Sequence, residues 1–334
     1  MRVTIKDVSR AAGVSIKTVS RVLNKERYVR EDTRKKVEEA MAALRFSPSL
    51  AARTLAGHRS FQIALIYDNH SPHYIHQIQE GVWARCRQEG VRMLAQPVDV
   101  DAESLGDEIG GLIDEPHVDG VILSSPVTDA PLALAELERR NVRFVRISPG
   151  TNHAITSSVY MDDVQAADDM TTYLIGLGHR RIGFVLGHVS HMASDQRHFG
   201  YRRALDRAGI LYEPALVLPG QFDFASGMAA AETFLAMPSP PTAIFASNDD
   251  MAAGVLAYAH GLGIDVPGDL SVAGFDDTAL ASLVWPPLTT IRQPVREMAV
   301  AAASLLFAES QEVVHQHLDH ELVVRKSTAE VRGS

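Results

Sequence analysis

Apolar residues recur at the spacing of an α-helix three times within the first 46 residues. Thr4 precedes the first segment and Asp7 follows three residues later, which is the spacing of a capping box. Gly13 is suited to end this helix, and Ser15 is suited to cap the next one after a tight turn. Three short helices with a turn at this place predict a helix-turn-helix domain over residues 1–46. The apolar stripes comprise Ile5, Val8 and Ala12; Val19, Val22 and Leu23; and Val37, Ala40, Met41 and Leu44.

From Phe61 onward, short continuous apolar runs alternate with helical segments. Strands that are apolar throughout and lie between helices predict parallel sheets covered on both faces. Two successive series of such units predict an α/β body, residues 61–334, of two parallel-sheet subdomains with a cleft between them. The late segments LTTIRQP and ELVVRKST are expected to cross back between the subdomains. The expected subdomains are residues 61–160 with 289–320, and residues 161–288 with 321–334.

Residues 47–60 connect these two parts. The stretch SPSLAARTLAG has Ser47 as a cap, Pro48 at the first helical position and Gly57 at the end, which predicts a short helix. A helix of this length is not stable alone in water, and this one is more apolar than a linker requires. It is therefore either a hinge helix that acquires a partner or a helical linker that packs on the body.

The charge of the chain is distributed unevenly. The net charge is −9, yet residues 1–60 hold 14 Lys and Arg against six acidic residues, a net of +8 that leaves −17 for the remainder. A basic segment on an acidic body suggests that only the segment contacts a polyanion. No apolar run approaches the roughly 18 residues that span a membrane, and MRVTIKDVSR lacks the apolar core of a secretory signal. Cys86 is the single cysteine, so no internal disulfide can form and the cytoplasm is the expected compartment.

The second helical segment has a polar face suited to reading bases. Lys17, Arg21 and Asn24 lie at i, i+4 and i+7, opposite the apolar stripe. The second helix of a helix-turn-helix domain enters the major groove, where Lys and Arg donate to guanine and Asn reaches a base or a phosphate. Ile16 contacts a thymine methyl in one interpretation and packs loosely in another. The alternative for the whole face is simple solvation, which the turn, the spacing and the local charge together disfavour.

The segment VTIKDVSRAAGVSIKTVSRVLN resembles the DNA-binding headpiece of the LacI/GalR family of bacterial transcription regulators, and the resemblance continues to the carboxyl terminus. It implies a type I periplasmic-binding-protein fold for the body. It also implies that the hinge helix orders on DNA, pairs with its twin and inserts Leu55, beside Ala52, into the minor groove to kink a base step. Arg30 departs from the family pattern, which has Ser or Thr as the cap of the third helix, although the acidic residues after it can compensate through the helix dipole. The expected DNA contacts are Thr4, Ser15, Ile16, Lys17, Arg21, Asn24, Ala52 and Leu55.

Polar residues at the ends of the predicted strands indicate a ligand site, because ligands of open α/β sheets lie beyond the carboxyl ends of the strands. The strand ends supply Asp68-Asn69, Ser124-Ser125, Asp162, Asn248-Asp249 and Asp276-Asp277. By position, the resemblance implies that Arg197, Phe222, Asn248 and Asp276 hold an effector, together with Tyr74 and Asp162. Acidic residues after strands also cap the next helix, so each has this structural alternative. The expected effector-binding residues are Asn69, Tyr74, Ser125, Asp162, Arg197, Phe222, Asn248 and Asp276.

The chemistry of these side chains favours a neutral mono- or disaccharide. Carboxylates and amides near one arginine suit vicinal hydroxyls, and Phe222 or Tyr74 suits the apolar face of a pyranose. An anionic ligand would be repelled by Asp162 and Asp276. A nucleobase or nucleoside stays open as an alternative, because Phe222 could stack on it and Asp276 could accept from a ring N–H.

The sequence contains no enzyme signature. There is no G-x-G-x-x-G after the first strand, no G-x-S-x-G and no P-loop, and we expect neither a cofactor nor a metal. The histidines of NHSPHYIH and HQHLDH do not have a convincing ligand geometry. We therefore expect a cytoplasmic homodimeric repressor of carbohydrate genes on a pseudo-palindromic operator, with an activator as one alternative and a binding protein without regulatory output as another. The final residues TAEVRGS lack the heptads of a tetramer.

Overall fold

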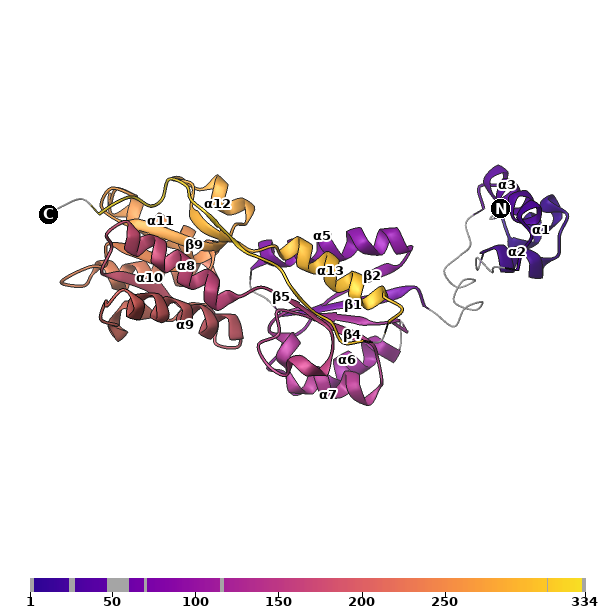
Figure 1. The fold of residues 1–334 in the computed structure, drawn as a ribbon, viewed down its shortest axis with the longest axis horizontal. Coiled ribbons are helices and arrows are strands. Elements are labelled where there is room, and N and C mark those ends of the chain that lie inside the picture. The colour runs from indigo at the N-terminus through magenta and orange to yellow at the C-terminus, as the bar shows by residue number, and fades with distance from the viewer. Residues whose placement is uncertain are drawn as a thin grey trace.

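The amino-terminal domain is a three-helix bundle, as predicted. Gly13, with φ of 65°, takes the left-handed conformation that the turn after the first helix requires. Side chains from all three helices form one small core of Val8, Val19, Val22, Val37 and Ala40. The helices are α1 (Ile5–Ala12), α2 (Ile16–Leu23) and α3 (Glu31–Ala43). The computed structural model describes residues 3–23, 28–46, 60–68, 71–114, 117–310 and 312–331 (Figure 1).

The first subdomain of the body is a six-stranded sheet in the order β11-β5-β4-β3-β1-β2, with parallel neighbours throughout. Ile63 and Leu65 of β1 join the core under α5 and α13, whereas Ala64 and Ile66 join the core over α6 and α7. The two helix pairs lie on opposite sides of the sheet in Figure 1. Burial on both faces explains why this strand is apolar at consecutive positions. The elements are β1 (Gln62–Tyr67), α5 (Pro72–Glu89), β2 (Arg92–Pro97), α6 (Leu105–Asp114), β3 (Val121–Leu123), α7 (Pro131–Arg139), β4 (Phe144–Ile147), β5 (Ser158–Tyr160), α13 (Val295–Phe307) and β11 (His315–His317).

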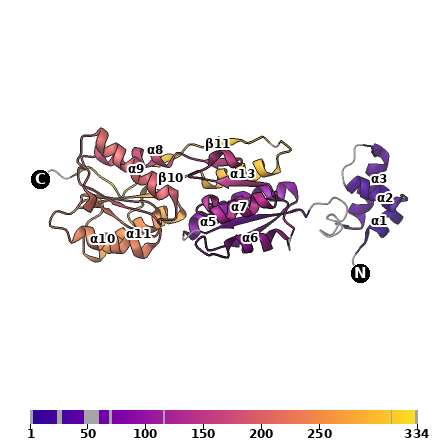
Figure 2. The same ribbon diagram turned by 90° about the horizontal axis from the view of Figure 1, so that it is seen from below.

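The second subdomain repeats this architecture in the order β12-β10-β9-β8-β6-β7. Ala243 and Phe245 of β8 pack toward α8 and α9, and Ile244 and Ala246 pack toward α10 and α11. Figure 2 shows these helix pairs on the two faces of the sheet. The elements are α8 (Asp163–Gly176), β6 (Ile182–Val185), α9 (Met192–Arg207), β7 (Val217–Leu218), α10 (Phe224–Leu235), β8 (Ala243–Ala246), α11 (Asp249–Gly261), β9 (Ser271–Asp276), α12 (Ala279–Leu283), β10 (Thr289–Arg292) and β12 (Glu321–Val323). Short 3-10 turns occupy Val127–Asp129, His153–Ile155 and Pro214–Leu216.

The chain passes between the subdomains three times, after β5, after β10 and after β11. The second passage differs from the predicted boundary. Because β10 pairs with β9, Thr289–Arg292 belongs to the second subdomain, and the chain leaves it after Arg292 and not before Thr289. The final strand β12 runs antiparallel to β10, so the second sheet is mixed and not wholly parallel. The long carboxyl-terminal segment, yellow in Figure 1, runs alongside the junction of the two subdomains.

Several predicted positions lie outside the described residues. They include the hinge segment 47–59, with Ala52 and Leu55, and also Asn24 and Asn69. Among the residues that are described, none of the helices combines the length and the apolar character that crossing a membrane requires.

Candidate functional site

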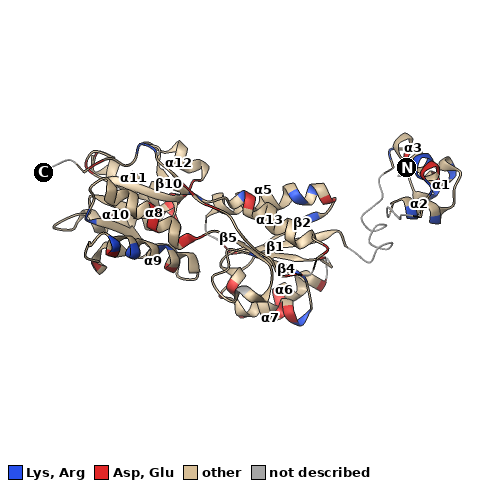
Figure 3. Ribbon diagram, viewed as in Figure 1, with Lys and Arg blue, Asp and Glu red and all other residues tan. Residues whose placement is uncertain are grey.

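The candidate DNA-reading surface is the exposed face of α2. Val19 and Val22 point into the small core, and Ile16, Lys17 and Arg21 lie on the exposed face. Ile16 is 43% exposed, so it is accessible to a partner. Figure 3 shows the basic residues distributed over the three helices of this domain.

Thr4 and Ser15, two further predicted DNA contacts, stabilise helix ends. The Asp7 carboxylate accepts hydrogen bonds from the Thr4 amide at 3.0 Å and from the Thr4 hydroxyl at 2.7 Å. These two bonds lower the pKa of Asp7. Ser15 Oγ accepts from the Thr18 amide at 3.1 Å and thereby caps α2. Each side chain therefore has a structural role beside any contact with DNA.

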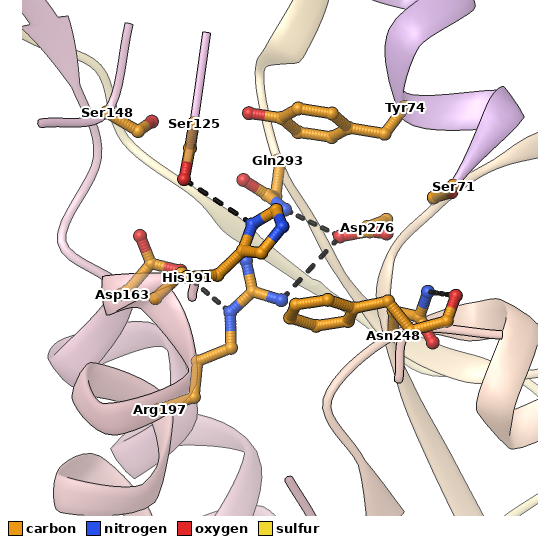
Figure 4. Close-up of a pocket in the computed structure, with 12 residues that line it drawn as sticks. Ser71, Tyr74, Ser125, Ser148, Asp163, His191, Arg197, Asn248, Asp276 and Gln293 are labelled. Carbon is orange, nitrogen blue, oxygen red and sulfur yellow. Dashed lines mark hydrogen bonds and ion pairs between the residues drawn. The ribbon is translucent and has the colours of Figure 1, made fainter. Parts of the chain in front are cut away.

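A pocket lies between the two subdomains, at the carboxyl ends of both sets of strands (Figure 4). It brings together six of the eight predicted effector residues: Tyr74, Ser125, Arg197, Phe222, Asn248 and Asp276. Sequence reasoning missed the other lining residues, which are Ser71, Ser148, Asp163, His191, Ala193 and Gln293. Ser148 and Gln293 directly follow β4 and β10, so the strand-end rule would have found both if it had been applied to these strands.

Arg197 is the central cation of the pocket. It projects from α9 and is only 5% exposed. Its Nε donates to Asp163 Oδ1 at 2.8 Å, its Nη1 donates to the Ser247 carbonyl at 2.5 Å, and the guanidinium carbon lies 3.7 Å from the centroid of the Phe275 ring. These contacts fix the guanidinium plane, so Arg197 can donate to a ligand without first losing side-chain freedom.

Asp276 faces Arg197 across the pocket (Figure 4). One carboxylate oxygen lies 4.0 Å from Nη1 of Arg197 and accepts from the Gln293 side-chain amide at 2.5 Å. Burial raises the pKa of Asp276 to about 7, and this rise is opposed by Arg197 and Gln293 and reinforced by Asp250 and Asp163. Burial therefore favours the protonated carboxyl, which can donate to a ligand hydroxyl as well as accept from one.

Behind Asp276 lies a second buried carboxyl, that of Asp249. It accepts from the Thr278 amide at 2.8 Å and from the Thr290 hydroxyl at 2.7 Å. Burial, followed by the charge of Asp276, raises its pKa well above the ordinary value. Asp276 and Asp249 are therefore costly to ionise together.

Asn248 and Phe222 are coupled to each other. The Asn248 side chain caps α11 by accepting from the Met251 amide at 2.9 Å and donates to the Phe222 carbonyl at 2.9 Å. Phe222 has φ of 59°, so the amide helps to hold a backbone conformation that non-glycine residues rarely adopt. The capping role foreseen for Asn248 is thus present, and it also positions the aromatic ring of Phe222.

Asp162 does not line this pocket, contrary to the expectation, and lines instead a neighbouring cavity that shares Ser148 and Asp163 with it. Its exposed side chain caps α8 by accepting from the Gln165 amide at 2.8 Å. The next residue, Asp163, is buried and faces the pocket instead, where it pairs with Arg197. Asp162 therefore has the helix-capping role that was the alternative to ligand binding for an acidic residue after a strand.

Two polar contacts join the subdomains around the pocket. Ser71 Oγ, at the start of α5, donates to Asp250 Oδ2 of α11 at 2.9 Å. Ser125 Oγ lies 3.4 Å from Nδ1 of His191. The pocket between them measures about 40 Å³, far below the roughly 300–1,000 Å³ of typical ligand sites. A ligand must therefore widen this space by separating the subdomains or by turning side chains.

The two walls of the pocket differ in chemistry. The first subdomain presents the hydroxyl groups of Ser71, Ser125, Ser148 and Tyr74. Burial raises the pKa of Tyr74, so its hydroxyl stays neutral. The second subdomain presents charged groups and an aromatic ring. This combination can bind a polyhydroxylated molecule. Among the described residues no three His, Cys, Asp or Glu side chains are grouped to hold a metal ion, and His315 and His320 contact Ser158 and Asp169.

Comparisons with known proteins agree with this architecture. Residues 4–49 match the family described as bacterial regulatory proteins, lacI family, and residues 171–328 match a periplasmic binding protein-like domain. The transcriptional repressor PurR of Photobacterium profundum is 31% identical over 332 residues, which cover 98% of this chain and 99% of the relative.

Two solved structures are also similar over the whole chain. A lac repressor dimer bound to operator and an anti-inducer has a TM-score of 0.83 at 30% identity, covering 98% of this chain and 100% of its own. A complex of the transcriptional regulator CelR with cellobiose has a TM-score of 0.74 at 31% identity, with the same coverage.

Proposed function

Because the chain belongs to the lacI family of bacterial regulatory proteins, we propose that it represses transcription and that a small neutral saccharide between its subdomains controls its affinity for operator DNA. The chain is a DNA-binding transcriptional regulator and not an enzyme. A DNA-binding regulator must reach chromosomal DNA, so we propose that this protein is cytoplasmic.

The proposed DNA contacts divide by role. Lys17 and Arg21 read base edges in the major groove from the exposed face of α2, and Ile16 contacts a thymine methyl. Thr4 and Ser15 stand at helix ends, where they position the backbone near phosphates. Asn24, Ala52 and Leu55 complete the proposed set, with Leu55 as the wedge in the minor groove.

A homodimer on a pseudo-palindromic operator is part of the proposal. A two-fold protein presents two recognition helices to two half-sites one helical turn apart or multiples of it. The similarity to a lac repressor dimer bound to operator supports this arrangement.

The observation that carries the saccharide proposal is the convergence of Arg197, Asp276 and Gln293 beside the ring of Phe222. These groups supply donors and acceptors to vicinal hydroxyls, and the ring suits the apolar face of a pyranose. The one buried arginine of the site is already paired with Asp163, which disfavours a phosphorylated or otherwise anionic ligand. The similarity to a regulator in complex with cellobiose supports a sugar as well.

A nucleobase is the second candidate. The PurR relative favours it, since its name associates it with purines, and Phe222 with a protonatable Asp276 could hold a purine ring. The hydroxyl wall of the first subdomain weighs against it, because those four hydroxyl groups match several hydroxyls better than a flat heterocycle.

The saccharide acts by linking the two walls. A ligand bonded both to Ser125 and to Arg197 favours one relative position of the subdomains over another. Since both subdomains belong to one body that carries the headpiece, this shift is coupled to operator affinity.

Calorimetric titration of the full chain with neutral sugars, sugar phosphates and purines tests the proposal, followed by a gel shift on upstream DNA with and without the ligand. Asp276→Asn is expected to weaken sugar binding at least tenfold. Asp107→Asn is the matched control, because it makes the same chemical change at an exposed position of α6 away from the pocket, and it should bind like the wild type. Binding of purines alone, or a sugar that leaves the gel shift unchanged, would contradict the proposal.

A further inference from the structure

The cleft continues beyond the pocket on the side of β1 and β2. A neighbouring cavity of about 370 Å³ lies between Asp68 and the loop after β2 in the first subdomain and the loop after β6 in the second. It adjoins the pocket at His191, which lines both spaces. This volume falls within the roughly 300–1,000 Å³ of typical ligand sites, which the pocket alone does not reach.

A row of aromatic rings leads from the pocket into this cavity. The ring of His191 lies 5.1 Å from that of Phe222 at an interplanar angle of 71°. On its other side, His191 lies 6.0 Å from His188 at 80°. Both distances fall within the 4.5–7 Å range of aromatic contacts, so the three rings form one continuous wall of the second subdomain.

His188 is held in place by its own loop. The Ser190 amide donates to Nδ1 of His188 at 3.2 Å, and the Ser194 hydroxyl donates to the His188 carbonyl at 2.9 Å. Because Nδ1 accepts from the Ser190 amide, a neutral imidazole carries its proton on Nε2. The ring is therefore a fixed, partly apolar surface with a polar edge.

The opposite wall supplies acceptors. Asp68 and Asp99 line the cavity from the first subdomain, and both also shape the loop after β2: Asp68 Oδ2 accepts from the Val100 amide at 2.9 Å, and Asp99 Oδ1 accepts from the Asp101 amide at 3.0 Å. Each carboxylate has further acceptor capacity for ligand hydroxyls. The cavity thus has aromatic rings on one wall and carboxylates on the other. The pocket combines the same two kinds of group.

We propose that this cavity is a second sugar-binding subsite, so that the effector is a disaccharide or a glycoside with one ring at Phe222 and the next at His188. The inference rests on the proposed saccharide function and names its ligand class. A cavity of similar size, about 310 Å³, lies on the other side of the pocket. It is bounded by the segments that cross between the subdomains, and its rings of Tyr160 and His317 lie 5.4 Å apart.

Calorimetric titration of the full chain with matched pairs tests the subsite: glucose with cellobiose and maltose, galactose with lactose, and xylose with xylobiose. At least one disaccharide should bind about tenfold more tightly than its monosaccharide. His188→Ala should remove most of this preference and leave the monosaccharide affinity unchanged, since one aromatic contact contributes roughly two- to tenfold. His188→Phe should keep the preference because it keeps a ring. Val189→Ala is the control from the same loop, since that side chain is 86% exposed.

Each contrary result has its own meaning. If a monosaccharide binds as tightly as every disaccharide, the second subsite is refuted while the saccharide function stands. If His188→Phe loses the preference as His188→Ala does, the histidine supports the loop and the ring contact is refuted. If only purines such as hypoxanthine and guanine bind, the saccharide function itself is refuted.

Discussion

Replacing Asp276 by Asn tests the electrostatics of the pocket in the absence of any ligand. The Asp276 carboxyl is 4% exposed, and its pKa is raised to about 7 chiefly by burial. An aspartate in the unfolded chain has a pKa near 3.9. Between these values the folded protein binds a proton that the unfolded chain does not, so this group lowers the free energy of unfolding as the pH rises through that window.

The size of the effect follows from the width of the window. At 1.36 kcal/mol per pH unit, about three units correspond to roughly 4 kcal/mol as an upper limit. Asparagine resembles the neutral carboxyl and can still accept from Gln293. The substitution also removes the Asp276 charge, which raises the pKa of Asp249. This second effect likewise makes the variant more stable than the wild type at higher pH. We therefore expect the stability of Asp276→Asn relative to the wild type to grow by about 1–3 kcal/mol between pH 5 and pH 8.

Urea unfolding of the full chain at pH 5 and pH 8 measures this difference in stability. The unfolding is followed by far-ultraviolet circular dichroism at constant ionic strength. Asp162→Asn is the control, because its carboxyl is exposed and lies outside the pocket. A stability difference that is independent of pH, or one that shifts toward the wild type as the pH rises, would refute the assignment of a strained buried charge to Asp276.

Three further predictions concern the two binding surfaces. Lys17→Ala and Arg21→Ala should each weaken operator binding by roughly 1–3 kcal/mol in a fluorescence anisotropy titration and leave effector binding unchanged, and wild-type affinity for either would remove that residue from the reading set. Leu55→Ala should keep weak, salt-sensitive DNA binding but lose discrimination at the central base step, since phosphate contacts survive; equal specificity in a competition assay would favour a plain linker. Gly187→Ala would place a Cβ atom 1.9 Å from the Phe222 ring, so effector affinity should fall roughly two- to tenfold by calorimetry, and unchanged affinity would show that the ring is not a contact.

The strand-end rule located part of the pocket from sequence, because parallel strands bring their carboxyl ends to one edge of a sheet. Tyr74, Arg197 and Phe222 came instead from the family resemblance. Asn248 and Ser125 come shortly after β8 and β3, and Asp276 is the last residue of β9, so the rule found them without any knowledge of the side-chain packing. The three-helix headpiece was equally predictable, since its core residues recur at a regular spacing.

Local spacing cannot decide questions that depend on packing between distant segments. Asp162 and Asp163 are adjacent acids at the start of α8, and only the direction of the helix in the folded chain determines that the second one faces Arg197. Likewise, β10 joins the second sheet because β9 and β12 lie on its two sides, which no periodicity in LTTIRQP reveals. His191 belongs to the pocket only because two loops from different subdomains meet there.

The outermost strands have a consequence for synthesis on the ribosome. β11 pairs with β5, and β12 pairs with β10, so an edge strand of each sheet comes from residues 315–323. A nascent chain that has emerged only to residue 310 has completed neither sheet, and the inner strands β5 and β10 then form the unpaired edges. Open edges of this kind recruit other strands, and pairings that await distant residues form slowly. Chains truncated by a premature stop in this region are therefore expected to aggregate and be degraded, and not to accumulate as half-folded regulators.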